Sequence, residues 1–498
     1  LHDGDSSLFL PVSISRFHLF RPVTGPVWSH GTWNETEGDS RSADLTLYDD
    51  RGNRVALLEG LQVRAVSRTA LRQMVGSSSE RLLYHMTWRE EPLPSPTERS
   101  GRWMVIGEDV SLVNTTAEAL GGRDQSCLRV SLDDGFESKG EPSFDEETVT
   151  LCSTRPEHWA SVFERHFDGE DAGPLNGIVW LTARDASRDQ HDFDPDTYAH
   201  RHCAGILALF QSLRARRIES LDRGFQILTF DGTCVDGEES VDPDAAQFWG
   251  MGRVIGSEYP PLRCRLLDYH SDNDSLDRLI EVLLIESRES QIALRDRETF
   301  VPRLVSLSAP SGDEAVPIRK GSTYLVTGGL GMLGRRAGEW FAERGAEDIV
   351  LVSRRAPTES TRELIDRIEE SGSRVHVMLA DIGDRGSLEK LLERIDDELP
   401  PLRGVLHAAG ILDDGLFVEQ TWDRFEKVMT PKKSGARHLH ELTMDRELDF
   451  FILYSSAASV LGSPGQANYA TANAYLDGLA HYRRAKGLPA LSINFGPW

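Results

Sequence analysis

The spacing of hydrophobic and polar positions divides the chain into a β-rich beginning and two units in which strands and helices alternate. Within residues 1–68, PVSISRFHLF and ADLTLYDDRGNRVALLEGLQVRAVS show strand patterns on either side of a turn predicted at residues 50–53. This part is short for an independent domain, so we expect it to be a piece of a larger sheet. The polar stretch 69–81 is predicted to be a helix or linker.

The first alternating unit covers residues 82–305. The apolar stretches RWMVIGED, TVTLCS, NGIVWLTA and FQILTFDG are typical of buried strands, and DTYAHRHCAGILALFQSLRAR has the apolar face of a helix. A connector at 306–318 is rich in Ser, Pro and Gly, and it precedes the second unit at 319–498. The alternation of strands and helices predicts an α/β fold.

Composition and charge narrow the class of protein. The formal net charge of −25 argues against a nucleic-acid-binding surface and fits a soluble cytoplasmic protein. The five cysteines are widely spaced without a CxxC pair, which indicates a reducing compartment and no zinc site. The amino-terminal residues lack a signal-peptide pattern, and no apolar run approaches about 18 residues. We therefore expect no metal and no contact with nucleic acid or membrane.

A glycine-rich turn marks the second unit as the candidate cofactor binder. The stretch TGGLGMLG follows a strand and opens a helix, with Thr327 ahead of Gly328, Gly331 and Gly334. Free N–H groups and the dipole at a helix start attract phosphate, and glycine lets the backbone approach it closely. The first unit opens with WMVIGEDVSLVNTTAEAL, which has the strand but lacks these glycines. We therefore predict a structural role for the first unit.

Residues at the ends of the following strands refine the cofactor prediction. The strand DIVLVSRR ends in Ser353 and Arg354, where an NAD site typically has an acidic residue, and a guanidinium matches the 2′-phosphate of NADPH. Arg355 is expected to lie in solvent. Further cofactor contacts are predicted at the ends of the two following strands, from Asp381 to an adenine amine and at the small residues Ala408 and Gly410.

One stretch, YSSAASVLGSPGQANYATANAYLDGLA, suggests the chemistry. Ser456 ends the apolar strand LDFFILYSS, and Tyr469 and Asn473 are four residues apart, so they share a face if this stretch is helical. The Ser456 hydroxyl and the Tyr469 phenol could then converge at one sheet edge. A Tyr and an Asn one turn apart also occur by chance in many helices, so this pattern alone does not define a site.

Together these motifs resemble the short-chain dehydrogenases/reductases, with one departure. Most members place a Lys four residues after the Tyr, whereas this chain has Asn473 there and Lys432 upstream. This exchange, with LHELT and NFGPW, resembles the ketoreductase domain of modular polyketide synthases and animal-type fatty acid synthases. FWGMGRVIGSEYP and RDRETFVPRLV resemble the structural subdomain of those ketoreductases. The resemblance covers about 82–498 and implies two Rossmann-like subdomains, the first structural and the second catalytic.

Residues 1–68 resemble the last part of a polyketide synthase dehydratase, a double hotdog, so a β-rich partial hotdog is expected before the ketoreductase. The catalytic His motif and Asp of that family lie upstream of this segment. Family members also continue beyond NFGPW with a lid helix and a last strand. We therefore expect the chain to be a fragment of a multienzyme.

The resemblance implies a role for each candidate catalytic residue. Tyr469 is the general acid, and the Lys432 ammonium lowers the pKa of that phenol and touches the nicotinamide ribose. Ser456 binds the ketone oxygen, and Asn473 holds a water that supplies protons. The neighbouring Lys433 misses the family position by one residue and is expected at the surface.

The resemblance also implies a stereochemical outcome. A Leu-Asp-Asp motif after HAAG is typical of B-type ketoreductases, which form the D-configured, usually 3R, hydroxyl. This chain has that motif. A-type ketoreductases have a Trp where this chain has Leu461. Thr471 stands where a Pro accompanies epimerisation, so no epimerisation is expected. The alternative for the two carboxylates is a solvated loop. The residues concerned are Leu412, Asp413, Asp414, Leu461, Pro464 and Asn468.

The sequence therefore predicts an NADPH-dependent reductase of a β-ketoacyl chain held by phosphopantetheine on an acyl carrier protein, working beside other domains of the same synthase. Two alternatives stay open at this point. The chain could be a reductase-inactive structural or docking segment, which NADPH binding would discriminate. It could also be an epimerase-only ketoreductase, although such domains usually lack part of the reductive set.

Overall fold

The structure is a computed structural model that describes residues 7–13, 15–21, 27–34, 40–67, 83–96, 99–133, 141–168, 173–182, 193–237, 239–270, 276–296, 298–307 and 316–496. One compact unit contains Leu1–His85 and Leu304–Gly312, and the other contains Met86–Arg303 and Asp313–Trp498. Within the second unit we call residues 86–303 the first lobe and residues 316–496 the second lobe.

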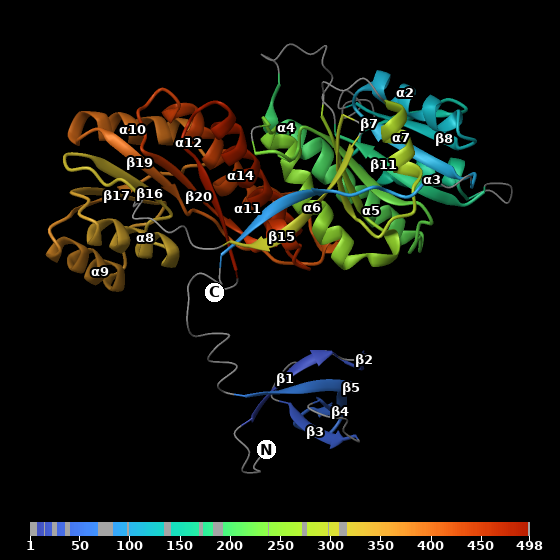
Figure 1. Cartoon of the computed structure of the whole chain (residues 1–498), viewed down its shortest axis with the longest axis horizontal. Coiled ribbons are helices and arrows are strands. Elements are labelled where there is room, and N and C mark those ends of the chain that lie inside the picture. Colours follow the sequence, from blue (N-terminus) through green and yellow to red (C-terminus); the bar gives the residue numbers. More distant parts are fainter. Residues whose placement is uncertain are drawn as a thin grey trace. The chain divides into compact units, whose positions relative to one another are not determined.

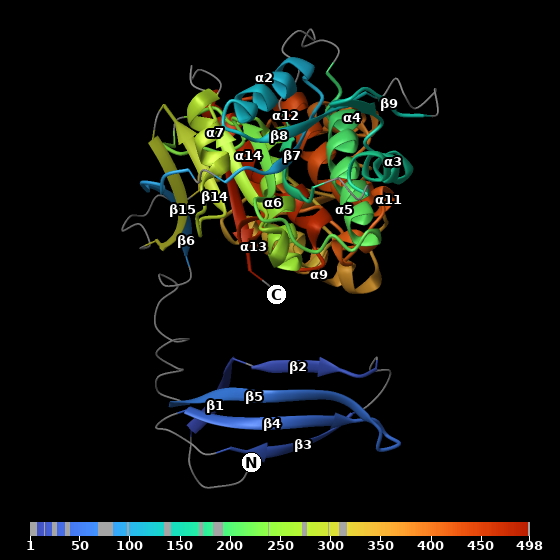
Figure 2. The ribbon, with the colours of Figure 1, turned by 90° about the vertical axis from the view of Figure 1, so that its right-hand side faces the viewer.

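The amino-terminal unit holds a five-stranded sheet of order β1-β5-β4-β3, with β2 also paired to β5 (Figure 2). Its strands are β1 (Ser7–Ser13), β2 (Arg16–Leu19), β3 (Trp28–Trp33), β4 (Ser40–Tyr48) and β5 (Arg54–Ser67). The predicted turn joins β4 to β5, where the Asp49 carboxylate accepts hydrogen bonds from the N–H groups of Arg51 (3.0 Å) and Asn53 (2.7 Å). Gly52 supplies the left-handed conformation, with φ of +79°.

The first lobe is built on a ten-stranded sheet of order β6-β15-β14-β13-β12-β11-β7-β8-β10-β9. Its strands are β6 (Tyr84–Glu90), β7 (Arg102–Gly107), β8 (Ser126–Leu132), β9 (Ser143–Phe144), β10 (Thr148–Leu151), β11 (Leu175–Leu181), β12 (Gly224–Phe230), β13 (Arg265–Tyr269), β14 (Gln291–Arg295) and β15 (Glu298–Ser306). Its helices are α2 (Val110–Gly121), α3 (Pro156–His166), α4 (Pro195–Ala199), α5 (Gly205–Ala215), α6 (Pro243–Glu258) and α7 (Leu276–Leu284), with a π-helical stretch at His200–Ala204 and a 3-10 turn at Pro260–Leu262.

The second lobe is built on a six-stranded parallel sheet of order β18-β17-β16-β19-β20-β21. Its strands are β16 (Thr323–Thr327), β17 (Asp348–Ser353), β18 (Arg374–Leu379), β19 (Leu402–His407), β20 (Phe450–Ser456) and β21 (Leu491–Phe495). Its helices are α8 (Met332–Glu343), α9 (Glu359–Glu370), α10 (Arg385–Glu398), α11 (Trp422–Met429), α12 (Gly435–Thr443), α13 (Ala457–Leu461) and α14 (Ala467–Ala485), with a 3-10 turn at Phe417–Glu419 and a π-helical stretch at Thr430–Ser434.

Both lobes share one strand order. Numbered along the chain from β16, the second sheet reads 3-2-1-4-5-6, the order of dinucleotide-binding folds. Numbered from β7 without the short β9, the central six strands of the first sheet, β10-β8-β7-β11-β12-β13, read the same way, and their neighbours are parallel. The predicted fold class, α/β with two Rossmann-like subdomains after a β-rich segment, is confirmed.

The first lobe has carboxylates where a dinucleotide fold would bind phosphate. After β7, the buried Glu108 pairs with Arg201, and the Asp109 side chain caps α2 by accepting the Leu112 N–H at 3.0 Å. These acidic groups stand at the helix start that would otherwise attract an anion. The turn therefore disfavours a pyrophosphate, in keeping with the predicted structural role.

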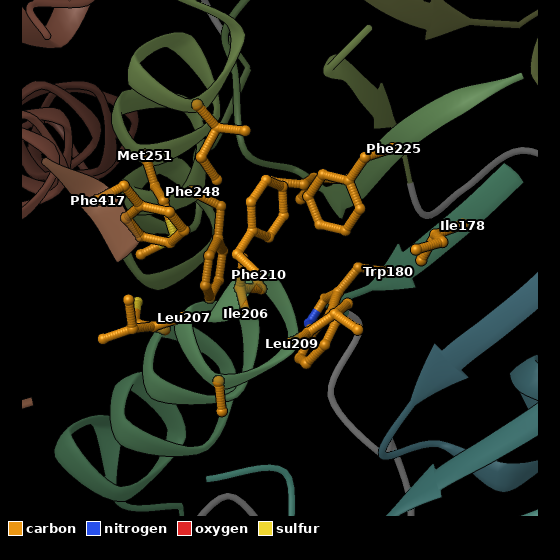
Figure 3. Packing of buried hydrophobic residues seen from close by; sticks show 14 of the residues in the cluster. Ile178, Trp180, Ile206, Leu207, Leu209, Phe210, Phe225, Phe248, Met251 and Phe417 are labelled. Carbon is orange, nitrogen blue, oxygen red and sulfur yellow. The ribbon is translucent and has the colours of Figure 1, made fainter. Parts of the chain in front are cut away.

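One hydrophobic cluster contains residues of both lobes. Figure 1 shows α6, α11 and α14 lying between the two sheets. Helices α6 and α14 cross so closely that a Cβ on Gly250 would lie 2.1 Å from the backbone oxygen of Ala470. Phe417 of the second lobe is fully buried in the first-lobe core beside Phe248 and makes an edge-on contact with Phe210 at 5.4 Å (Figure 3). Burial of such aromatic surface fixes the lobes against each other.

Candidate active site

The glycine turn after β16 is closed by contacts that admit no side chain. Gly328 has φ of +66°, and a Cβ there would lie 2.8 Å from the Cα of Ala409. A Cβ on Gly334 would lie 2.3 Å from the Gly328 oxygen, and the Gly331 N–H donates to that oxygen at 2.9 Å. Gly331 is also the residue that precedes α8. The turn therefore brings the start of α8 close to the ends of β16 and β19.

A cavity of about 460 Å³ opens at this edge of the sheet, a size typical of ligand sites. Seven of the nine predicted cofactor residues line it, namely Gly328, Gly331, Ser353, Arg354, Asp381, Ala408 and Gly410. The other two lie beneath it. Thr327 is buried, with its Oγ1 at 2.8 Å from Nδ1 of His407, and Gly334 packs under the turn. These two residues shape the turn and do not line the cavity.

Two arginines lie at the end of β17. Arg354 and Arg355 are exposed and both line the cavity, so Arg355 is in solvent as expected but also near the site. Among the described residues, no carboxylate pairs with either guanidinium. The Ser353 hydroxyl accepts the Arg355 N–H at 3.2 Å and shapes the turn that carries both side chains. Asp381, which also lines the cavity, is held by its own turn, in which its Oδ1 accepts the Gly383 N–H at 3.0 Å.

His407 is a structural residue of this edge. Burial, with a smaller contribution from the Lys432 charge, lowers its pKa to about 3, so the imidazole is neutral at physiological pH. Its contact with Thr327 joins the ends of β16 and β19 below the cavity.

Lys432 is buried at the floor of the site. It comes from the π-helical stretch between α11 and α12, and its Nζ donates to the backbone oxygen of Tyr454 at 2.9 Å. The same Nζ lies 5.3 Å from the ring centre of Tyr469. A Cβ on Gly410 would meet the Lys432 Cε at 2.8 Å, so this glycine makes room for the lysine. Burial lowers the Lys432 pKa to about 8, against the opposing charge of Asp477.

Tyr469 is half-buried near the start of α14. Burial raises its pKa above the ordinary value, while hydrogen bonding by the side chains of Asn473 and Ser456 acts in the opposite direction. The expectation that Lys432 lowers this pKa stays a prediction: the Lys432 amine lies 5.3 Å from the ring centre and donates to the backbone oxygen of Tyr454. The phenol therefore keeps its proton at neutral pH, the state that a general acid requires.

Ser456 and Asn473 flank the phenol. Ser456 ends β20, and its Oγ accepts the Ala458 N–H at 3.2 Å, which leaves the hydroxyl proton for another acceptor. Asn473 is fully buried on α14, and its Nδ2 donates to the Tyr469 backbone oxygen at 2.8 Å. Its Oδ1 has no hydrogen-bond partner among the described residues, and a buried acceptor of this kind suits a water molecule.

The predicted surface position of Lys433 is wrong. Its side chain is only 1% exposed and forms an ion pair with Asp244 of α6 at 2.9 Å. The Nζ also donates to the Pro195 oxygen at 2.9 Å and lies 3.3 Å from Oε1 of Gln247. The π-helical stretch thus aims consecutive lysines at different partners, Lys432 at the site and Lys433 at the first lobe.

The loop after β19 is held by ion pairs. Asp413 pairs with Arg424 and Lys427 of α11 at 2.7 and 2.8 Å, and these cations hold its pKa below the usual range. The solvated-loop alternative therefore does not describe Asp413. Asp414 accepts a hydrogen bond from Gln466 at 3.1 Å.

The remaining candidates for stereocontrol differ in exposure. Asn468 is buried, and its Nδ2 donates to the backbone oxygen of Asp413 at 2.8 Å. Leu412 and Leu461 are 61% and 62% exposed, and Pro464 is exposed as well. Leucine side chains at this exposure are available for contact with a ligand.

A partly buried carboxylate on α14, the helix of Tyr469 and Asn473, was not predicted from the sequence. Asp477 accepts hydrogen bonds from Ser459 at 2.7 Å, from Ser492 at 2.6 Å and from Asn494 at 2.9 Å. Burial raises its pKa, and its charge acts on Lys432. Because Asp477 follows Asn473 by the same four-residue step that separates Asn473 from Tyr469, the helical spacing was a signal for it.

A dinucleotide-type turn lines the cavity, and a buried amine packs against the cavity residue Gly410 and faces a protonated phenol; together they define the class as a nicotinamide-dependent oxidoreductase. Family models match three segments: KR domain at 322–498, Polyketide synthase extender module SpnB, Rossmann fold domain at 88–304, and Polyketide synthase dehydratase N-terminal domain at 1–73.

Solved structures and curated proteins agree with these matches. An A-type ketoreductase from a modular polyketide synthase is 32% identical with a TM-score of 0.69, covering 84% of this chain and 83% of that one. The first ketoreductase of the tylosin synthase is 29% identical with a TM-score of 0.67, covering 85% and 83%. Polyketide synthase GfsA of Streptomyces halstedii is 34% identical over 95% of this chain and 6% of its own length. A phenolphthiocerol/phthiocerol polyketide synthase of Mycobacterium tuberculosis is 30% identical over 98% of this chain and 26% of its own length.

The chain belongs to the ketoreductases of modular polyketide synthases, which are β-ketoacyl reductases, and it carries a dehydratase segment ahead of the ketoreductase. The matching dehydratase model describes an N-terminal domain, whereas the sequence predicts the C-terminal part; which end the segment represents stays a prediction. The chain spans 6% and 26% of the two curated relatives above. In the described part of the chain, every helix is too short or too polar to cross a membrane.

Proposed function

We propose that this chain reduces a β-ketoacyl thioester, held on an acyl carrier protein, to a D-configured (3R) β-hydroxyacyl thioester with NADPH. The observation that carries the proposal is the gathering of Tyr469, Ser456 and Asn473 around Lys432, which itself packs against Gly410 of the glycine-lined cavity. When bound, the nicotinamide supplies hydride to the carbonyl carbon. The chain itself must bind the ketone and deliver a proton to its oxygen.

Tyr469 is the proton donor in this mechanism. Its raised pKa keeps the phenol protonated until the ketone oxygen gains negative charge. The Ser456 hydroxyl donates to the same oxygen and stabilises that charge. Lys432 stabilises the phenolate that Tyr469 becomes, and a water on the unpaired Oδ1 of Asn473 returns a proton to it.

NADPH is preferred over NADH because of the cationic end of β17. Arg354 lines the cavity and has no carboxylate partner among the described residues, so its guanidinium is available for a 2′-phosphate. The turn from Gly328 to Gly331 and the start of α8 would hold the pyrophosphate, with Ala408 and Gly410 beside the nicotinamide end.

The partners follow from the family. An acyl carrier protein would present the substrate on its phosphopantetheine arm, and other domains of the same synthase would supply and consume it in the cytoplasm. The assignment to the B-type rests on the Leu412-Asp413-Asp414 motif and on Leu461, although the similar structure above is named an A-type ketoreductase. The fixed geometry of Asp413 supports a role for this loop in guiding the arm. Thr471 supports reduction without epimerisation.

The test compares Tyr469→Phe with Tyr482→Phe, a half-buried tyrosine on the same helix that packs on His440 away from the cavity. Tyr469→Phe should lose about 10²–10⁴-fold in ketone reduction and keep NADPH binding, because only the proton donor is removed. Tyr482→Phe should reduce normally. Near-normal turnover by Tyr469→Phe would refute the assignment, and absence of NADPH binding to the unaltered protein would favour a reductase-inactive docking segment.

Stereochemistry is read from the product. The unaltered protein, given NADPH and a 2-methyl-3-ketoacyl thioester of a single methyl configuration, should yield the D-hydroxy product with that configuration retained, as resolved by chiral chromatography. An L-hydroxy product would overturn the B-type assignment. Release of methyl-epimerised material would overturn the prediction from Thr471.

A further inference from the structure

One carboxylate of the first lobe bonds two separate loops of the second lobe. Glu258 is the last residue of α6, and its Oε2 accepts the Phe417 N–H at 2.8 Å while its Oε1 accepts the Gly465 N–H at 2.8 Å. Phe417 belongs to the loop after β19, and Gly465 belongs to the loop between α13 and α14. Each oxygen of the carboxylate therefore serves one loop.

These loops also contact each other and lead to the phenol. The Gly415 N–H donates to the Gly465 oxygen at 2.8 Å. Asn468 continues the connection, because its Nδ2 donates to the backbone oxygen of Asp413 at 2.8 Å and its Oδ1 accepts the backbone N–H of Tyr469 at 2.7 Å. A shift of either loop would therefore be passed to the residues on both sides of the substrate entrance.

The position of Glu258 is costly for helix α6 itself. A negative charge at a helix carboxyl end opposes the helix dipole, so a glutamate is disfavoured there unless it gains other contacts. Both oxygens gain charge-assisted bonds to backbone N–H groups, which are stronger than bonds between neutral partners. A neutral amide offers one acceptor oxygen and would present its NH₂ group to the second N–H.

The helix that carries Glu258 is a firm support. Its Gly250 lies against Ala470, the residue after Tyr469, with no room for a side chain. Phe248 and Met251 of the same helix pack beside Phe417 (Figure 3), whose backbone N–H is the one that Glu258 binds. The loop after β19 is thereby fixed to α6 through both its side chain and its backbone.

We propose that Glu258 is a positioning residue that sets the spacing of the two loops, and through it the orientation in which the acyl-pantetheine thioester meets the cofactor. The inference rests on the proposed function, since these loops carry Asp413 and Pro464. It gives the cofactor-free lobe a part in substrate selectivity. Glu258 touches no reacting atom, so it acts only through the loops.

The test compares Glu258→Gln and Glu258→Ala with Ile255→Val, which trims a buried side chain on the same helix and controls for loss of stability. We expect both Glu258 variants to raise KM for the ketothioester about tenfold, the worth of one charge-assisted hydrogen bond, and to lower the diastereomeric purity of the product. NADPH affinity should change less than twofold in all three. Ile255→Val should keep KM and diastereomeric purity, even if its Tm falls as much as that of the Glu258 variants.

Hydrogen exchange separates this proposal from the proposed function. Amides of Phe417 and Gly465 should exchange faster in Glu258→Gln than in Ile255→Val, whatever reaction the protein performs. Unchanged exchange at both amides, or unchanged KM and purity in an active Glu258→Ala variant, would overturn the role of Glu258. A wild-type L-hydroxy product would overturn the B-type proposal alone.

Discussion

Replacing Asp244 by Asn tests whether the first lobe supports the lysine pair of the second lobe. The Asp244–Lys433 contact is 2.9 Å long between side chains that are 9% and 1% exposed. Removing the carboxylate leaves the Lys433 cation buried against the neutral oxygens of Pro195 and Gln247. Breaking a buried pair from one side costs about 3–5 kcal/mol, because one charge stays unpaired.

The expected effect is large enough for thermal unfolding to detect. At about 2–4 °C per kcal/mol for a large domain, Asp244→Asn should lower Tm by about 6 °C or more, and Lys433→Met, which leaves the Asp244 carboxylate unpaired, should do the same. The double variant Asp244→Leu/Lys433→Met removes both charges and should recover most of the loss, since an apolar pair often replaces a buried ion pair at little cost.

The double variant also provides the refutation. If its Tm falls by the sum of the losses measured for Asp244→Leu alone and Lys433→Met alone, the residues are not coupled and the ion pair does not stabilise the lobe contact. The same conclusion would follow if Asp244→Asn left Tm within about 1 °C of the unaltered protein. Glu157→Gln on the exposed face of α3 is the surface control and should leave Tm unchanged.

Three further predictions use separate measurements. Arg354→Ala should weaken NADPH binding at least about tenfold and leave NADH binding nearly unchanged, since only NADPH carries the 2′-phosphate; equal losses would show that Arg354 does not bind that group. The reduction rate should fall as pH rises through about 8, because the Lys432 ammonium, whose pKa burial lowers, is lost above that value while Tyr469 stays protonated; a Lys432→Met enzyme that keeps the same limb would contradict this. Gly250→Ala should destabilise the protein by about 1–3 kcal/mol in thermal unfolding, since the new Cβ would stand 2.1 Å from the Ala470 oxygen, and a normal Tm would show that α6 and α14 can separate freely.

Much of the fold could be predicted because its signals are local. The strand before Gly328 and the helix after it are encoded within a few residues, and the closeness of Gly328 to Ala409 explains why glycine is needed there. Ser456 and Tyr469 were likewise indicated by strand pattern and helical spacing. Lys432 was reached only through the family resemblance, since neither strand pattern nor helical spacing connects it with Tyr469.

Contacts between distant segments could not be predicted in this way. Lys433 was expected in solvent because its carboxylate partner, Asp244, lies in the other lobe and nothing near Lys433 indicates it. The pKa of Tyr469 could not be predicted for a related reason. Its direction depends on how far the phenol is buried and on which carbonyl the Lys432 amine binds, and both are known only after the lobes are packed.

The shared packing of α6 and α14 bears on the exchange of domains between synthases. A recombination boundary placed near residue 310 would join an α6 from one parent to an α14 from another. Two parents can differ at Gly250 or Ala470, or at the residues that bond Glu258. The α6–α14 contact of the hybrid would then pack poorly next to the reacting groups. Hybrid enzymes should therefore inherit residues 86–496 from a single parent.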